Sequence, residues 1–151
     1  MPDNWNDLRE RFAVVSADFL AEASHVDGDR ATEPGVCGVW SARDIVAHMA
    51  AWDWEGERHF RELHTGDAKG RSYDIDAFNA AAVEERSEQS WSETLDELRR
   101  ANMTFGASLA NVSPGDQEAE PGYARWLKAV TGHYIQHAAQ IRDWMGASAS
   151  S

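Results

Sequence analysis

Apolar residues recur at steps of three and four along much of the chain, which is the period of an α-helix. The first such stretch covers residues 5–25, and a segment with Pro and Gly residues at 26–39 interrupts the pattern. Ser41 and Asp44 then form a variant of the capping box, in which side chains satisfy amide groups of the first helical turn. We therefore predict a helix over 5–25, a connecting loop, and a second helix over 41–65.

The second half of the chain continues this helical pattern. Residues 74–88 predict a shorter helix, and Ser90 with Glu93 forms a capping box that opens a longer one. An acidic connector at 118–122 leads to the last periodic stretch, over residues 123–145. The alternating pattern of a β-strand does not occur over a useful length of the sequence. The predicted fold class is therefore all-α.

Four main helices joined by modest connections pack most simply as an up-and-down four-helix bundle, with residues 74–88 as one additional short helix. The 151 residues are the usual size of one domain, and the hydrophobic content of 42% is enough for a core without disulfides. We predict that residues 1–146 form a single bundle domain. Gly146 is typical of a helix terminator, and we expect a disordered tail at 147–151.

The chain is strongly acidic, with a formal net charge of -12 from 26 acidic and 14 basic residues. The basic residues are scattered, which argues against nucleic acid, and the acidity opposes adsorption to anionic membranes. Cys37 is the one cysteine, so no intramolecular disulfide can form. The N-terminal residues lack the basic start and the apolar core of a signal peptide, and no apolar stretch approaches the roughly eighteen residues of a membrane helix. We expect a cytoplasmic protein with a small-molecule substrate.

Histidines interrupt the apolar stripes of two predicted helices. His133 and His137 lie four residues apart, so on a helix the second imidazole is rotated by about 40° and raised by about 6 Å relative to the first. Both can reach one ion, although two core histidines bonded to neighbours are the alternative. Burial leaves ring nitrogens that need partners, and a metal ion is one such partner. His48 lies on the equivalent stripe of the 41–65 helix and could supply a third ligand.

Three neutral imidazoles with water in the open positions describe a catalytic rather than a closed structural site. Imidazole suits zinc, nickel, copper and iron, and we expect one divalent ion, zinc or nickel. Gln140 could hydrogen bond to a ligand or orient bound water, or else join two helices. Trp52, one turn after His48, could wall a pocket beside the metal and contact a cofactor, although tryptophan is more often a core residue.

Three further residues could take part in this site. His59 lies on the same helical face as His48 and could face the same cavity. Glu55 has the phase to look inward, whereas a solvated acidic face is the alternative in so acidic a chain. Cys37 is a candidate nucleophile only if its surroundings lower its pKa, and a buried thiol is the alternative.

Two segments, VWSARDIVAHMAAWDWE and GHYIQHAAQIRDW, together resemble the DinB superfamily of four-helix-bundle proteins. The resemblance extends over nearly the whole chain and includes the WS helix opening and the terminal HxxxHxxQI run. It implies a metal site at His48, His133 and His137 and, in several branches, a transfer reaction with a low-molecular-weight thiol. Mycothiol and bacillithiol are such thiols, and a metal ion would favour the thiolate that attacks an electrophilic substrate.

A third segment, IDAFNAAAVEER, resembles the ClbS and DfsB branch, which includes cyclopropane hydrolases that protect cells from genotoxic natural products. Two enzymatic interpretations follow, both in detoxification or stress response. One is a metal-dependent thiol S-transferase, and the other is a hydrolase of strained electrophiles that needs no thiol. A noncatalytic protein that holds a small molecule is the third interpretation. The resemblance is also compatible with a homodimer, because bundles of the family associate through helices.

Overall fold

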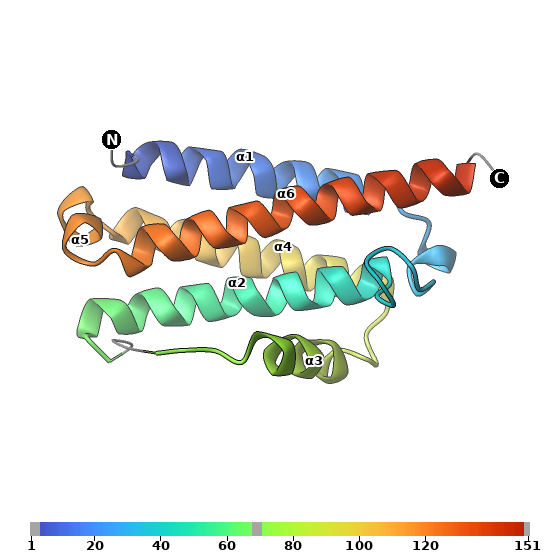
Figure 1. Ribbon diagram of the computed structural model, residues 1–151, viewed down its shortest axis with the longest axis horizontal. Coiled ribbons are helices and arrows are strands. Elements are labelled where there is room, and N and C mark those ends of the chain that lie inside the picture. The colour runs from blue at the N-terminus through green and yellow to red at the C-terminus, as the bar shows by residue number, and fades with distance from the viewer. Residues whose placement is uncertain (1–3, 68–70, 150–151) are drawn as a thin grey trace.

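The computed structural model describes residues 4–67 and 71–149. Four long helices lie side by side in it: α1 (Trp5–Ser24), α2 (Ala42–Thr65), α4 (Trp91–Ser108) and α6 (Gly122–Ala149) (Figure 1). Shorter elements complete the chain: η1 (Gly28–Arg30), α3 (Ile75–Glu85), η2 (Leu109–Asn111) and α5 (Pro114–Ala119). The described residues contain no strand, only an isolated bridge between Cys37 and Trp40. The predicted all-α bundle is confirmed.

Side-chain caps begin the long helices where the capping boxes predicted. The Ser41 hydroxyl accepts from the Asp44 amide at 3.1 Å, and the Asp44 carboxylate accepts from the Ser41 amide at 3.1 Å. Ser90 and Glu93 make the same pair of bonds at the start of α4. Gly66 ends α2 in the left-handed conformation, with φ of 87°. Local sequence signals therefore determine these helix boundaries.

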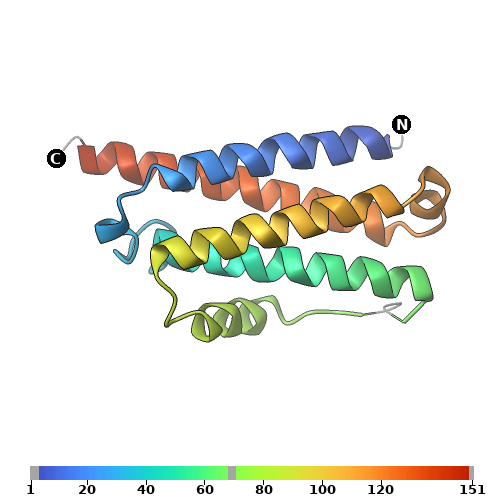
Figure 2. The same cartoon turned by 180° about the vertical axis from the view of Figure 1, so that it is seen from behind.

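The helix order departs from strict alternation. α1 and α6 run in one direction, whereas α2 and α4 both run in the other (Figures 1 and 2). The chain returns from the end of α2 through the extended residues 71–74 and α3, which lie along the outer side of α2. This crossover differs from the predicted up-and-down order, because periodicity identifies a helix but carries no information on its direction.

The four helices pack unevenly. α2 makes its most extensive contacts with α4, and α1 makes its most extensive contacts with α6. α2 and α6 meet over a narrower band, which we call the α2–α6 seam. α3 packs on α2 at the outside of the bundle. The seam is therefore the boundary between two more tightly packed helix pairs.

Two elements differ from the sequence prediction at the C-terminal end. α5 forms just before the acidic connector and extends into it, because Ser113 and Asp116 make a third capping box there. α6 continues through Gly146 to Ala149, so the expected tail at 147–151 is helical as far as residue 149. A glycine in a helix costs about 1 kcal/mol of helix stability relative to alanine. This cost is too small to end the helix at Gly146. Residues 150–151 lie outside the described part of the chain.

The core is rich in aromatic side chains. Phe12 contacts Phe105 and Tyr134 with ring centroids 5.3 and 6.0 Å apart, and Phe19 contacts Tyr134 at 5.2 Å, all edge to face. These arrangements are the ones that aromatic quadrupoles favour. None of the described helices is long and apolar enough to cross a membrane.

A polar group also lies in this core. The carboxyl of Asp53 in α2 is fully buried, and its Oδ2 accepts from the hydroxyl of Tyr134 in α6 and from Asn102 of α4 at 3.2 Å. Oδ1 has no hydrogen-bond partner among the described residues. Burial raises the pKa of Asp53 to about 7, although the bonds from Tyr134 and Asn102 lower it. Asp53 therefore links the two helices of the seam as a carboxyl group that is easily kept neutral.

Candidate metal centre

His48 of α2 and His137 of α6 meet across the α2–α6 seam. Their ring centroids are 5.0 Å apart at an interplanar angle of 87°, and both residues are buried. His133, one turn earlier on α6, is exposed and lies 6.3 Å from His137 between ring centroids. The structure thus brings His48 and His137 into contact and places His133 beside them at the more open edge.

Hydrogen bonds fix the proton on one nitrogen of each buried ring. The Nδ1 of His48 lies 3.3 Å from the carbonyl oxygen of Asp44, and the Nδ1 of His137 lies 2.7 Å from the side-chain oxygen of Gln140. Since both partners are oxygen acceptors, each Nδ1 donates and each Nε2 keeps its lone pair. Gln140 therefore orients His137 and leaves Nε2 available to bind an ion.

All three histidines are neutral at neutral pH. Burial, together with charge repulsion from nearby His137 and His133, lowers the pKa of His48 to about 3. Burial also lowers the pKa values of His137 and His133. Metal ions bind the deprotonated imidazole, so this environment holds the rings in the ligand form without competition from protons.

This donor set fits a divalent ion in charge, tautomer and ligand type. The three rings do not converge on one point, however, because within residues 4–67 and 71–149 no group of three or more His, Cys, Asp or Glu side chains is positioned to hold a metal. His48 and His137 are already in contact, and the third ligand would come from reorientation of the exposed His133 side chain. Exposed side chains change rotamer within nanoseconds. Two of the three histidines predicted as ligands therefore lie in contact, and their role as ligands stays a prediction.

Trp40, which belongs to the WS helix opening but was not predicted as a site residue, covers His48. The indole lies 4.6 Å from the His48 ring between centroids, at 53°. A tight turn holds it there, since the Trp40 amide donates to the Cys37 carbonyl at 2.9 Å and Gly38 has φ of 60°. The Cys37 side chain packs against the hydrophobic core. Cys37 therefore contributes to the turn, and Trp40 shields the first turns of α2 from water.

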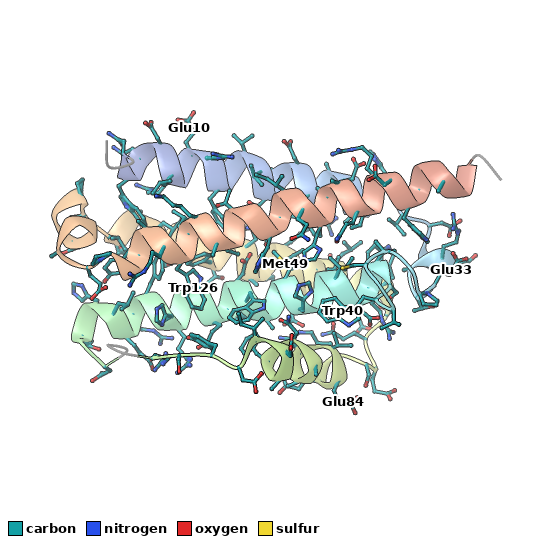
Figure 3. The ribbon with its side chains drawn as sticks, in the orientation of Figure 1. Glu10, Glu33, Trp40, Met49, Glu84 and Trp126 are labelled. Carbon is teal, nitrogen blue, oxygen red and sulfur yellow. The ribbon has the colours of Figure 1, made fainter. Side chains whose placement is uncertain are left out.

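A pocket of about 240 Å³ opens next to His133, and we call it the aromatic pocket. α2 contributes Trp52, and the crossover and the start of α3 contribute Tyr73 and Ile75. α6 contributes the remaining lining residues: Trp126, Ala129, Val130 and His133. Trp52 thus walls a pocket beside a candidate ligand, although that ligand is His133 rather than His48. Figure 3 shows Trp126 between α6 and α2, at a distance along the bundle from Trp40.

His59 and Glu55 lie behind the wall of the aromatic pocket rather than beside His48. The His59 ring stacks on Trp126, with centroids 4.5 Å apart at 23°, and its Nδ1 is 3.4 Å from the Tyr73 hydroxyl. Glu55 accepts from the same hydroxyl at 2.8 Å and forms an ion pair with Arg58. The structure therefore separates both residues from the histidine pair and gives them a role in holding Tyr73.

The fold and the paired histidines define a class of all-α bundles with a polar site between the second and the last long helix. A family model described as the DinB superfamily matches residues 2–141, so the chain belongs to the DinB superfamily. This confirms the resemblance seen in the two sequence segments. Proteins of this superfamily often bind a divalent metal, which agrees with the donor type of the site.

A solved structure titled "Sibling Lethal Factor Precursor - DfsB" has the same fold. The TM-score is 0.79, the sequence identity is 13%, and the match covers 98% of each chain. At this identity the likeness concerns the fold alone. A search of curated proteins found no significant match.

Proposed function

We propose that the chain is a metal-dependent enzyme of detoxification or stress response that promotes attack of a thiol on a small electrophile. The observation that supports this proposal most is the contact between His48 and His137 across the seam, with both Nε2 lone pairs free. His133 adds a third neutral imidazole at the edge of the aromatic pocket. Three imidazoles leave coordination positions open, as catalytic sites require.

The proposed reaction uses two neighbouring parts of the protein, the three-histidine site and the aromatic pocket. A divalent ion held by His48, His133 and His137 would favour the anionic form of a thiol or water bound beside it. Gln140 keeps the His137 tautomer, and Trp40 limits water access to His48. The aromatic pocket begins at His133, so an electrophile held there lies next to the nucleophile. Positioning of two reactants is the main contribution of the protein.

A second candidate function is hydrolysis of a strained electrophile by water. The fold shared with DfsB and the IDAFNAAAVEER segment support this alternative. It predicts turnover without added thiol, whereas S-transfer stops when the thiol is omitted. A third candidate, noncatalytic sequestration, is supported by the aromatic pocket itself and predicts tight binding without product.

The first experiment is metal analysis by elemental mass spectrometry on untagged protein purified without chelator. We expect about one zinc or nickel ion per chain, and its loss when His48, His133 and His137 are all replaced by Ala. A variant that lacks the exposed His25 and His64 is the matched control and should keep the ion. If the wild type offered both metals binds neither, the metal-dependent proposal is wrong.

Activity is then assayed with 1-chloro-2,4-dinitrobenzene as a general electrophile, with and without a panel of low-molecular-weight thiols. Thiol-dependent turnover that disappears in the triple-histidine variant supports S-transfer. Turnover of the same size without thiol would mean that water is the nucleophile, and it would contradict S-transfer.

A further inference from the structure

The walls of the aromatic pocket present few free polar atoms. The Trp52 Nε1 donates to Asn79 at 2.7 Å, and the Tyr73 hydroxyl donates to Glu55 at 2.8 Å. The Trp126 Nε1 is directed at Gly56, because a Cβ added to Gly56 would lie 2.8 Å from that nitrogen. The His133 ring, by contrast, has no hydrogen-bond partner within the described part of the chain. The pocket is therefore apolar along its length and polar at the His133 end.

Three aromatic rings meet in this pocket at steep angles. Trp52 and Trp126 have centroids 5.7 Å apart at 62°, and Tyr73 lies 5.5 Å from each of them at 64°. A planar ring that stacks on one indole in this corner meets the other indole edge-on. Offset stacking and edge-to-face contact are the two arrangements that aromatic pairs prefer, at centroid distances of about 4.5–7 Å.

The outer faces of the two indoles are already covered by the protein. His59 stacks on Trp126 at 4.5 Å, and Phe78 lies over Trp52 at 4.0 Å and 30°. Each indole therefore presents to the pocket its edge and the face that His59 or Phe78 does not cover. His59 and Phe78 keep the indoles in place when the pocket is filled.

The volume of the pocket and the absence of charged side chains among its described lining residues indicate which ligands fit it. A cavity of roughly 150 Å³ is enough for one benzene molecule, so the volume of about 240 Å³ here suits one or two fused rings with a small substituent. None of the lining residues carries a permanent charge that would pair with a charged ligand. A neutral compound satisfies these walls best.

We infer that the electrophile of the proposed reaction is a neutral, planar aromatic compound of one or two rings. It lies between Trp52, Tyr73 and Trp126, with its reactive substituent against His133. The assignment of a reaction rests on the proposed function, but the binding step does not, because Trp52, Tyr73 and Trp126 are not among the proposed metal ligands. Ala129 and Val130 complete the flat side of the pocket.

The test uses 1-naphthalenemethanol as the probe, with cyclohexylmethanol as a non-planar comparison and tetramethylammonium as a cationic one. Calorimetry should give an affinity for the naphthalene probe about fivefold higher than for cyclohexylmethanol, since stacking adds about 1 kcal/mol. The NMR signals of the Trp52 and Trp126 indole N–H groups should shift, whereas those of Trp5 and Trp91 should not. Equal affinities, preference for tetramethylammonium, or shifts confined to other tryptophans would overturn the inference.

Two matched variants locate the site by filling it. Ala129 is exposed and lines the pocket, whereas Ala147 is exposed near the end of α6 and does not. Ala129→Trp should weaken binding of the probe by about tenfold or more, and Ala147→Trp should leave it unchanged. The double variant His48→Ala/His137→Ala should keep the probe affinity even though it loses the proposed metal. If the wild type binds the probe but neither zinc nor nickel, the proposed function alone is wrong. If it binds the metal but not the probe, this inference alone is wrong.

Discussion

Two titratable residues of α2, His48 and Asp53, make the stability of the fold depend on pH in opposite directions. The folded pKa of His48 is about 3, below the usual 6.5, so its stabilising effect is lost as the pH falls below about 6.5. The folded pKa of Asp53 is about 7, above the usual 3.8, so folding is favoured at low pH and this contribution is lost as the pH rises toward 7. The two effects oppose each other between about pH 4 and pH 6.5.

Replacing Asp53 by Asn should separate these effects. The rise of the pKa from 3.8 to about 7 corresponds to a penalty on the order of 4 kcal/mol above pH 7, which a neutral amide avoids. Relative to wild type, the unfolding free energy of Asp53→Asn should therefore increase from pH 4 to pH 7. Urea unfolding of chelator-treated protein measures it, with the exposed Asp18→Asn as control. A difference that stays constant with pH would contradict the raised pKa.

Gln140 allows a test of how the His137 ring is oriented. Gln140→Ala removes the acceptor of the His137 Nδ1 proton, and loss of such a partner lowers metal affinity by about 10- to 100-fold. Gln136→Ala, at an exposed position of α6, should change little. Competition with a chromogenic chelator measures both affinities. Unchanged zinc and nickel affinity in Gln140→Ala would show that Gln140 does not act on the ligand.

At the scale of elements, close approach between helices matters more than helix propensity in the middle of α2. Gly56 faces Trp126 of α6 and Phe105 of α4, and an added Cβ would lie 2.8 and 2.9 Å from them. Gly132 on α6 has nothing within 4 Å of the same added atom. The two glycines share a helical environment and differ in packing, so they form a matched pair.

Gly56→Ala should destabilise the protein by about 1–3 kcal/mol through overpacking, despite the better helix propensity of alanine. Gly132→Ala should instead stabilise it by roughly 0.5–1 kcal/mol. Chemical denaturation with equal m-values gives both changes. If Gly56→Ala were as stable as Gly132→Ala, the contact with Trp126 would not restrict the seam.

The sequence predicted most of these elements but less of the site. Capping boxes are local, so the starts of α2 and α4 followed from Ser41 and Ser90, and the helical period placed His48, His133 and His137 on inward stripes. Trp40 was missed because its contact with His48 depends on a turn in a loop. Asp53 was not predicted as a core residue, because its burial depends on the tertiary bond from Tyr134, which lies 81 residues later in the chain. The direction of α4 and the pocket wall from Tyr73 depend on the crossover, which periodicity does not describe.

For the whole molecule, the site lies where two helix pairs face each other, so ligand binding and folding are linked. An ion that binds only the folded chain at 100 times its dissociation constant adds about 2.7 kcal/mol of stability. Zinc or nickel should therefore raise the melting temperature of the wild type and leave His48→Ala/His137→Ala unaffected. Differential scanning calorimetry on chelator-treated protein, before and after metal addition, checks this. Equal shifts in both proteins would indicate binding elsewhere.

The uneven packing of the bundle has a mechanical consequence. The α2–α4 pair and the α1–α6 pair are each joined more extensively than α2 and α6 are, so opening along the seam leaves the most extensive helix contacts unbroken. Such breathing separates His48 from His137 while each pair stays intact. Any group that binds both rings therefore opposes the separation of α2 and α6. Its presence would slow amide hydrogen exchange along the facing sides of these two helices.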